Sequence, residues 1–293
     1  MKLPLPRRRT LRRVAVCMGV LVALFAATAW YVAGELLAPC PSIVGPPPDD
    51  FAAEVVSFVS ESGSRISGWL HHSESGRGVV VIAHGIRGSR RSSLSRAKLL
   101  GKYGYSTLLF DLQAHGESPG EQITLGHLER FDVQAAVSFA RLECPGQPIA
   151  VIGFSLGGAA AVLGSPLDVN ALVIETVYPT IEEAVDNRTR HRLGPIAPIA
   201  SWALLLQLEP RTGINCRDLR PIDKMHALGC PVLVIGGGQD FHTTMDQTRQ
   251  LYAAAAEPKQ LGIFEDLGHR NYAREAPELY ENMVVKFLQQ HMD

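Results

Sequence analysis

The chain has 293 residues, 46% of them hydrophobic, so it is long enough to bury a substantial core. Its formal net charge of −1 conceals an uneven distribution, because the first 34 residues contain six basic residues and no acidic one. The remainder carries 22 basic and 29 acidic residues, a net charge of −7. This balance argues against a nucleic-acid-binding body, which would need a basic face.

An uncharged apolar segment follows residues 1–13, the basic tail that contains all six of these basic residues. It runs from Val14 to Gly34, and a helix of its 21 residues is long enough to cross a hydrocarbon core about 30 Å thick. The positive charge before it, with Trp30 and Tyr31 near its far end, predicts a transmembrane signal anchor whose basic tail stays in the cytoplasm. We therefore expect a single-pass protein of the cell inner membrane, with its main domain on the periplasmic, extracytoplasmic side.

A cleavable signal peptide is the alternative to an anchor. Ala27-Thr28-Ala29 resembles an A-x-A cleavage site, and the basic residues before the apolar segment suit a signal peptide. Cleavage there would give a secreted protein. The apolar segment is longer than the usual hydrophobic region of a signal peptide, which favours the uncleaved anchor.

Residues 35–50 are rich in proline and end in Pro46-Pro47-Pro48. This composition predicts a stiff, extended linker that holds the domain at 51–293 a short distance from the bilayer. Of the five cysteines, Cys216 and Cys230 could pair in an oxidising compartment, although buried free thiols are favoured. No cysteine lies in a C-x-x-C pair or beside metal-spaced histidines, so we expect neither a metal nor another cofactor.

The pattern of the domain is that of an α/β fold. Two short strands with a hairpin signal between them come first, and from Gly78 apolar strands alternate with amphipathic helices, which predicts a mostly parallel sheet flanked by helices. The alternation stops between Thr180 and Pro221, a segment that fits either a small lid insertion after the sixth strand or a pair of ordinary packing helices. In both cases it is expected to line a substrate pocket. The predicted strands are 54–60, 65–71, 79–83, 106–111, 149–153, 171–175, 231–236 and 260–264, and the predicted helices are 92–103, 128–142, 156–163, 245–256 and 277–291.

A G-x-S-x-G pattern, Gly153-Phe154-Ser155-Leu156-Gly157, follows the buried strand at 149–153 and opens a helix. In this strand, turn and helix setting, the pattern is typical of a nucleophile elbow. Glycines two residues before and after the serine give the strand and helix room to pass closely. Ser155 is therefore the candidate nucleophile.

A serine hydroxyl needs a neighbouring base, which an acid must orient. Asp240 follows the strand at 231–236, and His269 follows the last strand, so the three residues occur in the order Ser, Asp, His. Asp240 could instead be a loop aspartate that caps the following residues. Glu175 at the end of an earlier strand is the better rival acid, Asp246 a poor one, and His242 is the nearest rival base.

Four motifs in register give the chain its resemblance to the α/β-hydrolase superfamily of serine esterases, lipases and peptidases. They are His84-Gly-Ile-Arg-Gly88, Asp111-Leu-Gln-Ala-His-Gly-Glu-Ser118, the elbow, and the late Asp and His at strand ends. The resemblance spans about Glu54 to the carboxyl terminus and implies the α/β-hydrolase fold.

The resemblance also assigns supporting roles. The backbone N–H groups of Ile86 and Leu156 are expected to form the oxyanion hole. His84 and His115 are expected to hold loops through ring hydrogen bonds. The family pattern often has Arg-Gly where this chain has Gln113-Ala114, a departure that leaves the expected triad intact.

These residues predict a serine hydrolase that cleaves carboxylic ester or thioester bonds through an acyl-enzyme intermediate. A peptidase or amidase of the same fold is the alternative, because a triad alone does not distinguish these substrates. A hydrolase-fold binding protein without activity is a third hypothesis. The expected partners are a small-molecule or lipid-like acyl substrate and, through the first helix, a membrane, with no nucleic acid. The sequence does not predict an oligomeric state.

Overall fold

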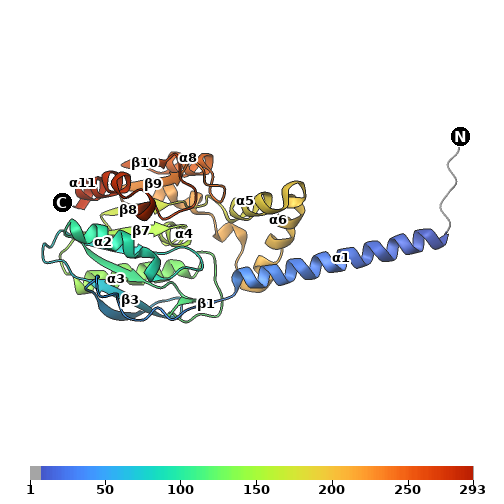
Figure 1. Ribbon diagram of the computed structural model, residues 1–293, viewed down its shortest axis with the longest axis horizontal. Helices are drawn as coiled ribbons and strands as arrows, with labels where there is room; N and C mark the ends of the chain where they lie inside the picture. The colour runs from blue at the N-terminus through green and yellow to red at the C-terminus, as the bar shows by residue number, and fades with distance from the viewer. Residues whose placement is uncertain (1–7, 293) are drawn as a thin grey trace.

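The fold is organised around an eight-stranded sheet within residues 8–292, the part of the chain that the computed structural model describes (Figure 1). The strand order is β10-β9-β8-β7-β4-β5-β3-β2. Neighbouring strands from β5 to β10 pair in parallel, whereas β3 and β2 pair antiparallel at one edge. The strands are β2 (Glu54–Val59), β3 (Arg65–His71), β4 (Val79–Ala83), β5 (Ser106–Phe110), β7 (Ile149–Phe154), β8 (Ala171–Glu175), β9 (Val232–Gly237) and β10 (Lys259–Phe264).

Both faces of the sheet are covered, which explains why its central strands are apolar at every position. In β4, Val79, Val81 and Ala83 belong to one buried cluster, whereas Val80 and Ile82 belong to the other. This division follows from the alternation of side chains along a strand. The first cluster packs with α3 (Glu129–Glu143), α4 (Leu156–Leu163) and α8 (Met245–Ala254), and the second with α2 (Leu94–Lys102) and α11 (Lys286–Met292).

The predicted α/β-hydrolase fold is confirmed in its sheet and flanking helices, and strand bounds agree to within one residue. The single helix predicted at 277–291 is wrong in detail. It consists of α10 (Pro277–Tyr280), a π-helical segment η5 (Glu281–Val285) and α11. Val284 and Val285 of this π-helical segment are both buried, and the hydrophobic pattern alone does not distinguish it from an uninterrupted α-helix.

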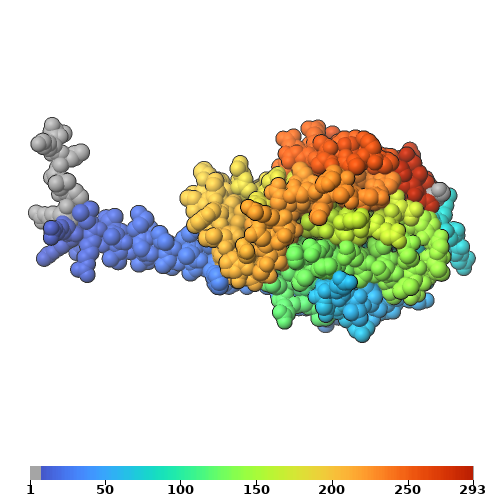
Figure 2. All heavy atoms as spheres, turned by 180° about the vertical axis from the view of Figure 1, so that it is seen from behind, coloured from blue at the N-terminus to red at the C-terminus, as the bar shows by residue number. Residues whose placement is uncertain are grey.

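The segment between β8 and β9 lies at the end of the body from which the first helix projects (Figures 1 and 2). We call residues 180–221 the lid. Thr180 caps its first helix by accepting a hydrogen bond from the Glu183 N–H. Its cysteine Cys216 and the nearby Cys230 are free thiols. The elements here are α5 (Ile181–Leu193), η2 (Gly194–Ile196), α6 (Ala197–Leu205), α7 (Leu208–Thr212), η3 (Cys216–Asp218) and η4 (Pro221–Ala227).

The first helix, α1 (Arg8–Leu37), projects from the body and is long and apolar enough to cross a membrane (Figure 1). A signal sequence near an amino terminus has the same character. Helix α1 extends three residues past the predicted end of the apolar segment, so its last turn lies inside the predicted linker. Lys2 and Arg7 of the predicted basic tail lie outside the described residues.

The prediction that residues 35–50 form a tether between the membrane segment and the domain is wrong, because this segment packs on the body. Its strand β1 (Cys40–Pro41) pairs in parallel with β6 (His115–Gly116). The Glu117 carboxylate accepts the backbone N–H groups of Val44 and Gly45 at 3.0 and 2.9 Å. Proline-rich composition indicates an extended backbone, and here that backbone is satisfied by the protein rather than by water.

Candidate active site

The turn between β7 and α4 holds Ser155 in a strained conformation. Its φ of 51° and ψ of −111° lie where a residue with a side chain is rarely found. A Cβ atom on Gly153 would lie 2.4 Å from the Gly158 Cα, and one on Gly157 would lie 2.6 Å from the Ala83 carbonyl carbon. The two glycines of the motif therefore provide the clearance that the sequence analysis assigned to them.

Ser155, His269 and Asp240 meet at the carboxyl edge of the sheet. The His269 Nε2 lies 3.1 Å from the Ser155 Oγ, and the His269 Nδ1 lies 2.8 Å from an Asp240 carboxylate oxygen. The Asp240 side chain is fully buried, whereas 17% of the His269 side chain is exposed. The three side chains thus form one line of hydrogen bonds, the order that proton transfer from a serine hydroxyl to an imidazole requires.

Asp240 combines two roles that the sequence analysis treated as alternatives. One carboxylate oxygen accepts the backbone N–H groups of His242 and Thr243 at 2.7 and 3.0 Å, as a loop aspartate would. The other oxygen accepts from His269. The backbone contacts hold the carboxylate in place, so its second oxygen faces the imidazole in a fixed orientation.

The rival residues have other partners. The Glu175 carboxylate forms an ion pair with Arg96 and accepts a hydrogen bond from the Tyr280 hydroxyl at 2.7 Å. Asp246 is an exposed residue of α8 near Arg249. The His242 ring packs edge-on against His269, with ring centroids 5.1 Å apart. Burial, aided by the Arg188 charge, lowers the His242 pKa to about 4.

The expected oxyanion donors come from the loop after β4 and from the residue after Ser155. Leu156 is the first residue of α4, and its position at the helix amino terminus favours negative charge. Ile86 lies in a turn closed by a hydrogen bond from the Gly88 N–H to the Gly85 carbonyl. The positive φ in this turn, 58°, belongs to Arg87, whereas Gly85 is needed because its Cβ would lie 2.8 Å from the Phe154 ring.

His84 and His115 make ring hydrogen bonds to loops. The His84 Nδ1–H donates to the Gly85 carbonyl at 2.7 Å, and its Nε2 accepts the Leu112 N–H at 3.1 Å, so the ring is neutral. Burial, followed by the nearby His115, lowers the His84 pKa to about 3. The His115 Nδ1–H donates to the Gln113 carbonyl at 2.9 Å. These contacts support the structural role expected for both rings.

The Gln113-Ala114 departure is also explained. The Gln113 side chain donates to the Gln122 carbonyl and to the Glu129 carboxylate, both at 2.8 Å. Ala114 has a φ of 59°, the left-handed conformation in which the glycine of the family pattern carries no penalty. The loop therefore holds an alanine in a conformation that favours glycine.

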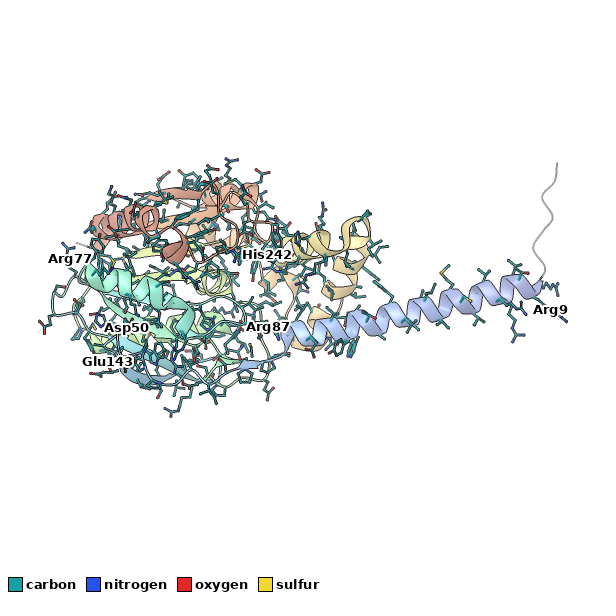
Figure 3. All side chains as sticks on the ribbon, viewed as in Figure 1. Arg9, Asp50, Arg77, Arg87, Glu143 and His242 are labelled. Carbon is teal, nitrogen blue, oxygen red and sulfur yellow. The ribbon has the colours of Figure 1, made fainter. Side chains whose placement is uncertain are left out.

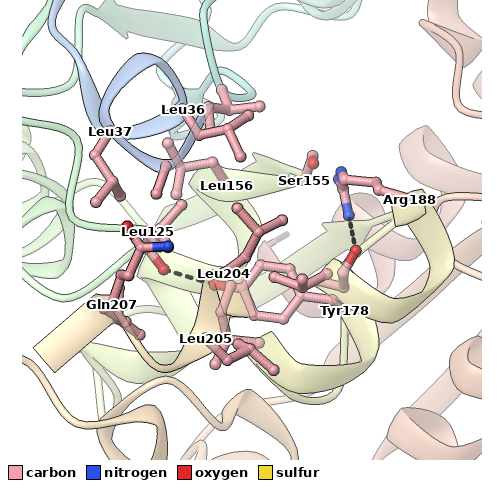
Figure 4. A pocket seen from close by; sticks show the side chains of 16 residues that line it. Leu36, Leu37, Leu125, Ser155, Leu156, Tyr178, Arg188, Leu204, Leu205 and Gln207 are labelled. Atoms are coloured by element: carbon pink, nitrogen blue, oxygen red, sulfur yellow. Dashed lines mark hydrogen bonds between the residues drawn. The ribbon is translucent and has the colours of Figure 1, made fainter. Parts of the chain in front are cut away.

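An apolar pocket of about 130 Å³, partly open to solvent, begins at Ser155 (Figure 4). Twelve of its sixteen lining residues are aliphatic, and Arg188 is the charged one. Half of the lining comes from the lid, as expected. The lining residues are Ala33, Leu36, Leu37, Ile86, Leu125, Ser155, Leu156, Tyr178, Ile181, Ala184, Val185, Arg188, Leu204, Leu205, Gln207 and Leu208.

A polar cleft lies on the other side of Ile86, which lines both hollows. His269 faces this cleft, and three arginines that do not pair with Glu175 line it: Arg87, Arg270 and Arg274. Glu275 lines it as well, and its carboxylate lies 4.0 Å from the Arg274 guanidinium. Figure 3 shows Arg87 near the junction of α1 with the body, where its guanidinium donates to the Glu35 carbonyl at 3.0 Å. The candidate nucleophile thus lies between an apolar and a basic surface. Residues 8–292 contain no group of three or more His, Cys, Asp or Glu placed to hold a metal ion.

Comparison with known proteins establishes the family. The model of the alpha/beta hydrolase family matches residues 80–282. The chain belongs to this family. An uncharacterised protein of Mycobacterium tuberculosis strain H37Rv is 30% identical over 239 residues, 80% of this chain and 76% of that protein. The hydrolase is also 32% identical over 133 residues to a thiohydrolase of Aspergillus aculeatus. This aligned region covers 43% of this chain and 42% of the fungal protein.

Among solved structures, the hydrolase is similar to an esterase of Pyrococcus furiosus. The TM-score is 0.73 at 21% sequence identity, with 88% of this chain and 99% of the esterase covered. At this identity the likeness shows the shared fold. Esterase and hydrolase relatives together support a hydrolase activity for this family member.

The sequence analysis missed two contributions to the site of this hydrolase. Ala33, Leu36 and Leu37 of α1 line the apolar pocket, and the signal for them was the apolar pair that continues the helix beyond Glu35. Arg188 lines it from α5, and its guanidinium donates to the Ala184 carbonyl at 2.8 Å. Nothing in the local pattern of α5 distinguishes Arg188 from the other arginines near it.

Proposed function

We propose that this protein is a serine hydrolase that cleaves carboxylic ester or thioester bonds, with Ser155 as nucleophile, His269 as base and Asp240 as the orienting acid. The observation that carries the proposal is the continuous hydrogen-bond line from Asp240 through His269 to a serine on a strained turn. A buried carboxylate orients the imidazole and stabilises its protonated form, which is what makes a serine hydroxyl nucleophilic.

The reaction proceeds in two steps. The Ser155 oxygen attacks the substrate carbonyl carbon while the His269 Nε2 takes the hydroxyl proton, and the imidazolium then protonates the departing alcohol or thiol. A water molecule, deprotonated by the same imidazole, attacks the acyl-enzyme and releases the carboxylic acid. The Ile86 and Leu156 N–H groups stabilise the negative charge that forms on the carbonyl oxygen in each step.

The two hollows give each half of the substrate a matching surface. The aliphatic lining of the apolar pocket suits an acyl chain, whose transfer from water is favourable by about 0.8 kcal/mol for each buried methylene. The arginines of the polar cleft suit a polar or anionic leaving group. An ester or thioester with an apolar acyl chain and a polar leaving group therefore fits the two surfaces better than a peptide. A peptide has polar backbone groups on both sides of the bond that is cleaved.

Covalent labelling tests the nucleophile. A fluorophosphonate probe should label the purified full chain, and Ser155→Ala should abolish that labelling. Ser138→Ala is the matched control, because this exposed serine of α3 donates only to the Gln134 carbonyl among its described contacts. Labelling that persists in Ser155→Ala would remove the proposed nucleophile, and a properly folded chain that takes no label would favour the binding-protein hypothesis.

A substrate panel tests the bond. We expect hydrolysis of p-nitrophenyl esters and acyl thioesters, with little hydrolysis of aminoacyl-p-nitroanilides. Amide hydrolysis without ester hydrolysis would replace the proposal by the peptidase or amidase alternative.

We also propose that α1 is an uncleaved anchor in the cell inner membrane, with the catalytic domain on the periplasmic side. The proposal is supported by the length of α1, by its apolar character and by the basic residues at its start. Secretion after signal-peptide cleavage is the alternative.

A further inference from the structure

The last turn of α1 is part of the wall of the apolar pocket. Ala33 and Leu37 are buried against the body, and Leu36 beside them is 43% exposed. The Leu37 carbonyl accepts the Ile123 N–H at 2.8 Å, which fixes the end of the helix. The pocket that opens at Ser155 is therefore closed on one side by the helix that is apolar enough to cross a membrane.

Residues of the lid also contact α1. Helix α6 contacts α1, and the Arg211 guanidinium lies 3.7 Å from the centroid of the Trp30 ring and donates to the Trp30 carbonyl. The lid lies at the end of the body from which α1 projects, in both views of the molecule (Figures 1 and 2). A bilayer around α1 would thus be next to the lid.

The lid carries a row of large apolar side chains that are mostly exposed. Ile196, Ile199, Trp202 and Leu206 are 60, 60, 63 and 60% exposed. They are three or four residues apart, so they follow one side of α6 and its ends. We call these four residues the apolar row. A row of this size is unusual on a surface that faces only water.

Along α1, the apolar pocket lies where the outer boundary of the hydrocarbon core is expected. A hydrocarbon core of about 30 Å accommodates roughly 20 helical residues, which places its outer boundary near the end of the segment 14–34. Trp30 and Tyr31 are 57 and 67% exposed at this level, where aromatic rings favour the interface. Ala33, Leu36 and Leu37 follow directly, so the pocket begins where acyl chains end and lipid ester groups lie.

We propose that the substrate of this site is an acyl ester of a membrane lipid, which reaches Ser155 directly from the bilayer along the last turn of α1. The proposal rests on the proposed serine-hydrolase function. The apolar row and α1 form one continuous bilayer-contacting surface. The acyl chain enters the apolar pocket past Leu36, and the headgroup side of the lipid faces the arginines of the polar cleft. The bilayer is favoured as the occupant of the apolar row because the row adjoins a helix suited to cross it.

The test compares two substrates of the same protein in the same vesicles. The full chain is reconstituted in vesicles of dioleoylphosphatidylglycerol containing a minor fraction of dioleoylglycerol, and release of oleic acid is measured beside hydrolysis of soluble p-nitrophenyl butyrate. The wild-type protein should hydrolyse both the soluble ester and a vesicle lipid. Hydrolysis of the soluble ester alone would overturn the membrane-lipid inference and leave the proposed function standing, whereas hydrolysis of neither would overturn both.

The apolar row supplies the first variant. Ile199→Ser with Trp202→Ser should lower oleic acid release at least about tenfold and leave soluble ester hydrolysis nearly unchanged, because two large side chains no longer enter the bilayer. The matched control is Val59→Ser with Leu142→Ser, which changes exposed apolar residues of β2 and α3. The inference is overturned if the lid variant lowers both activities equally, lowers neither, or behaves like the control.

The wall of the pocket supplies the second variant. Leu36→Trp adds bulk at a half-exposed position and should shift preference towards shorter acyl chains, so hydrolysis of dioctanoylglycerol in the vesicles should rise relative to dioleoylglycerol. An unchanged ratio of the two lipids would show that the chain does not pass α1, and would also overturn the inference.

Discussion

The Asp240 carboxylate both holds its own loop together and contacts His269, the proposed base. Two backbone N–H groups fix one of its oxygens, which leaves the other aimed at His269. Its burial makes the second contact effective, because a charge attracts a proton donor more strongly where water is excluded. The orientation of His269 therefore depends on a loop that the aspartate itself holds together.

The first prediction at the residue scale separates Asp240 from Asp246. Asp240→Asn should preserve the fold but lower kcat for a p-nitrophenyl ester by roughly 10⁴-fold, because an amide can hold the imidazole in the wrong tautomer. Asp246→Asn, at an exposed position on α8, should leave kcat unchanged. Equal rates for the two variants, with circular dichroism spectra like the wild type, would contradict the assigned role of Asp240.

The second prediction concerns His84 and acid stability. Burial lowers the His84 pKa to about 3, so the folded state keeps the ring neutral where the unfolded chain protonates it. The unfolded state then binds more protons below pH 6.5, and stability falls as the pH falls from about 6.5 towards 3. Between pH 7.5 and 5.0, His84 should account for about 2 kcal/mol of this loss.

The measurement compares urea unfolding of the detergent-solubilised full chain at the two pH values. His84→Asn should be less stable than the wild type at pH 7.5 but should lose less stability on acidification. A parallel loss in both proteins would show that His84 is not responsible for the slope.

At the scale of elements, the strands were easier to predict from the sequence than the segments that connect them. The parallel strands and the elbow were predictable because buried runs and G-x-S-x-G have local signatures, and β4 and α4 follow the predicted bounds. The course of residues 38–53 was not predictable, because β1 pairs with His115 and Gly116 and Glu117 accepts from Val44. These partners are distant in sequence and have no local pattern.

The packed linker gives the third prediction. Val44 is buried, with 5% of its surface exposed, whereas its neighbour Ile43 is 98% exposed. Val44→Ala should lower the free energy of unfolding by about 2 kcal/mol, and Ile43→Ala should leave it nearly unchanged. If the linker were a free tether, neither substitution would alter the urea midpoint.

At the scale of the whole molecule, α1 belongs to both the predicted anchor and the site. The sequence analysis separated a membrane segment, a linker and a hydrolase domain, and it assigned the pocket mainly to the lid. The apolar pair Leu36 and Leu37 indicated that the helix continues beyond Glu35, but not which surface of the body its end would meet, because that surface is distant in sequence. The meeting of Ser155, Asp240 and His269 was predictable, because the fold brings the ends of the strands before them to one edge of the sheet.

The fourth prediction concerns processing of the whole chain. Removal of residues 1–29 would leave only an eight-residue remnant of α1, without the length needed to cross a membrane. We expect the intact mass of the protein isolated from cells to include α1, and the protein to stay with membranes after an alkaline carbonate wash. A mature amino terminus at Trp30 in soluble protein would instead establish the signal peptide and the secreted location.

The fifth prediction tests the central claim, that the Ser155 hydroxyl attacks a carbonyl with the help of His269. Rapid mixing of the full chain with p-nitrophenyl butyrate, acid quenching and mass spectrometry of the peptides should detect a butyryl group on Ser155, together with a burst of about one p-nitrophenol per chain. The adduct and burst should be absent in Ser155→Ala and strongly reduced in His269→Ala. Steady hydrolysis without a butyryl group on Ser155, or undiminished hydrolysis by Ser155→Ala, would contradict the account.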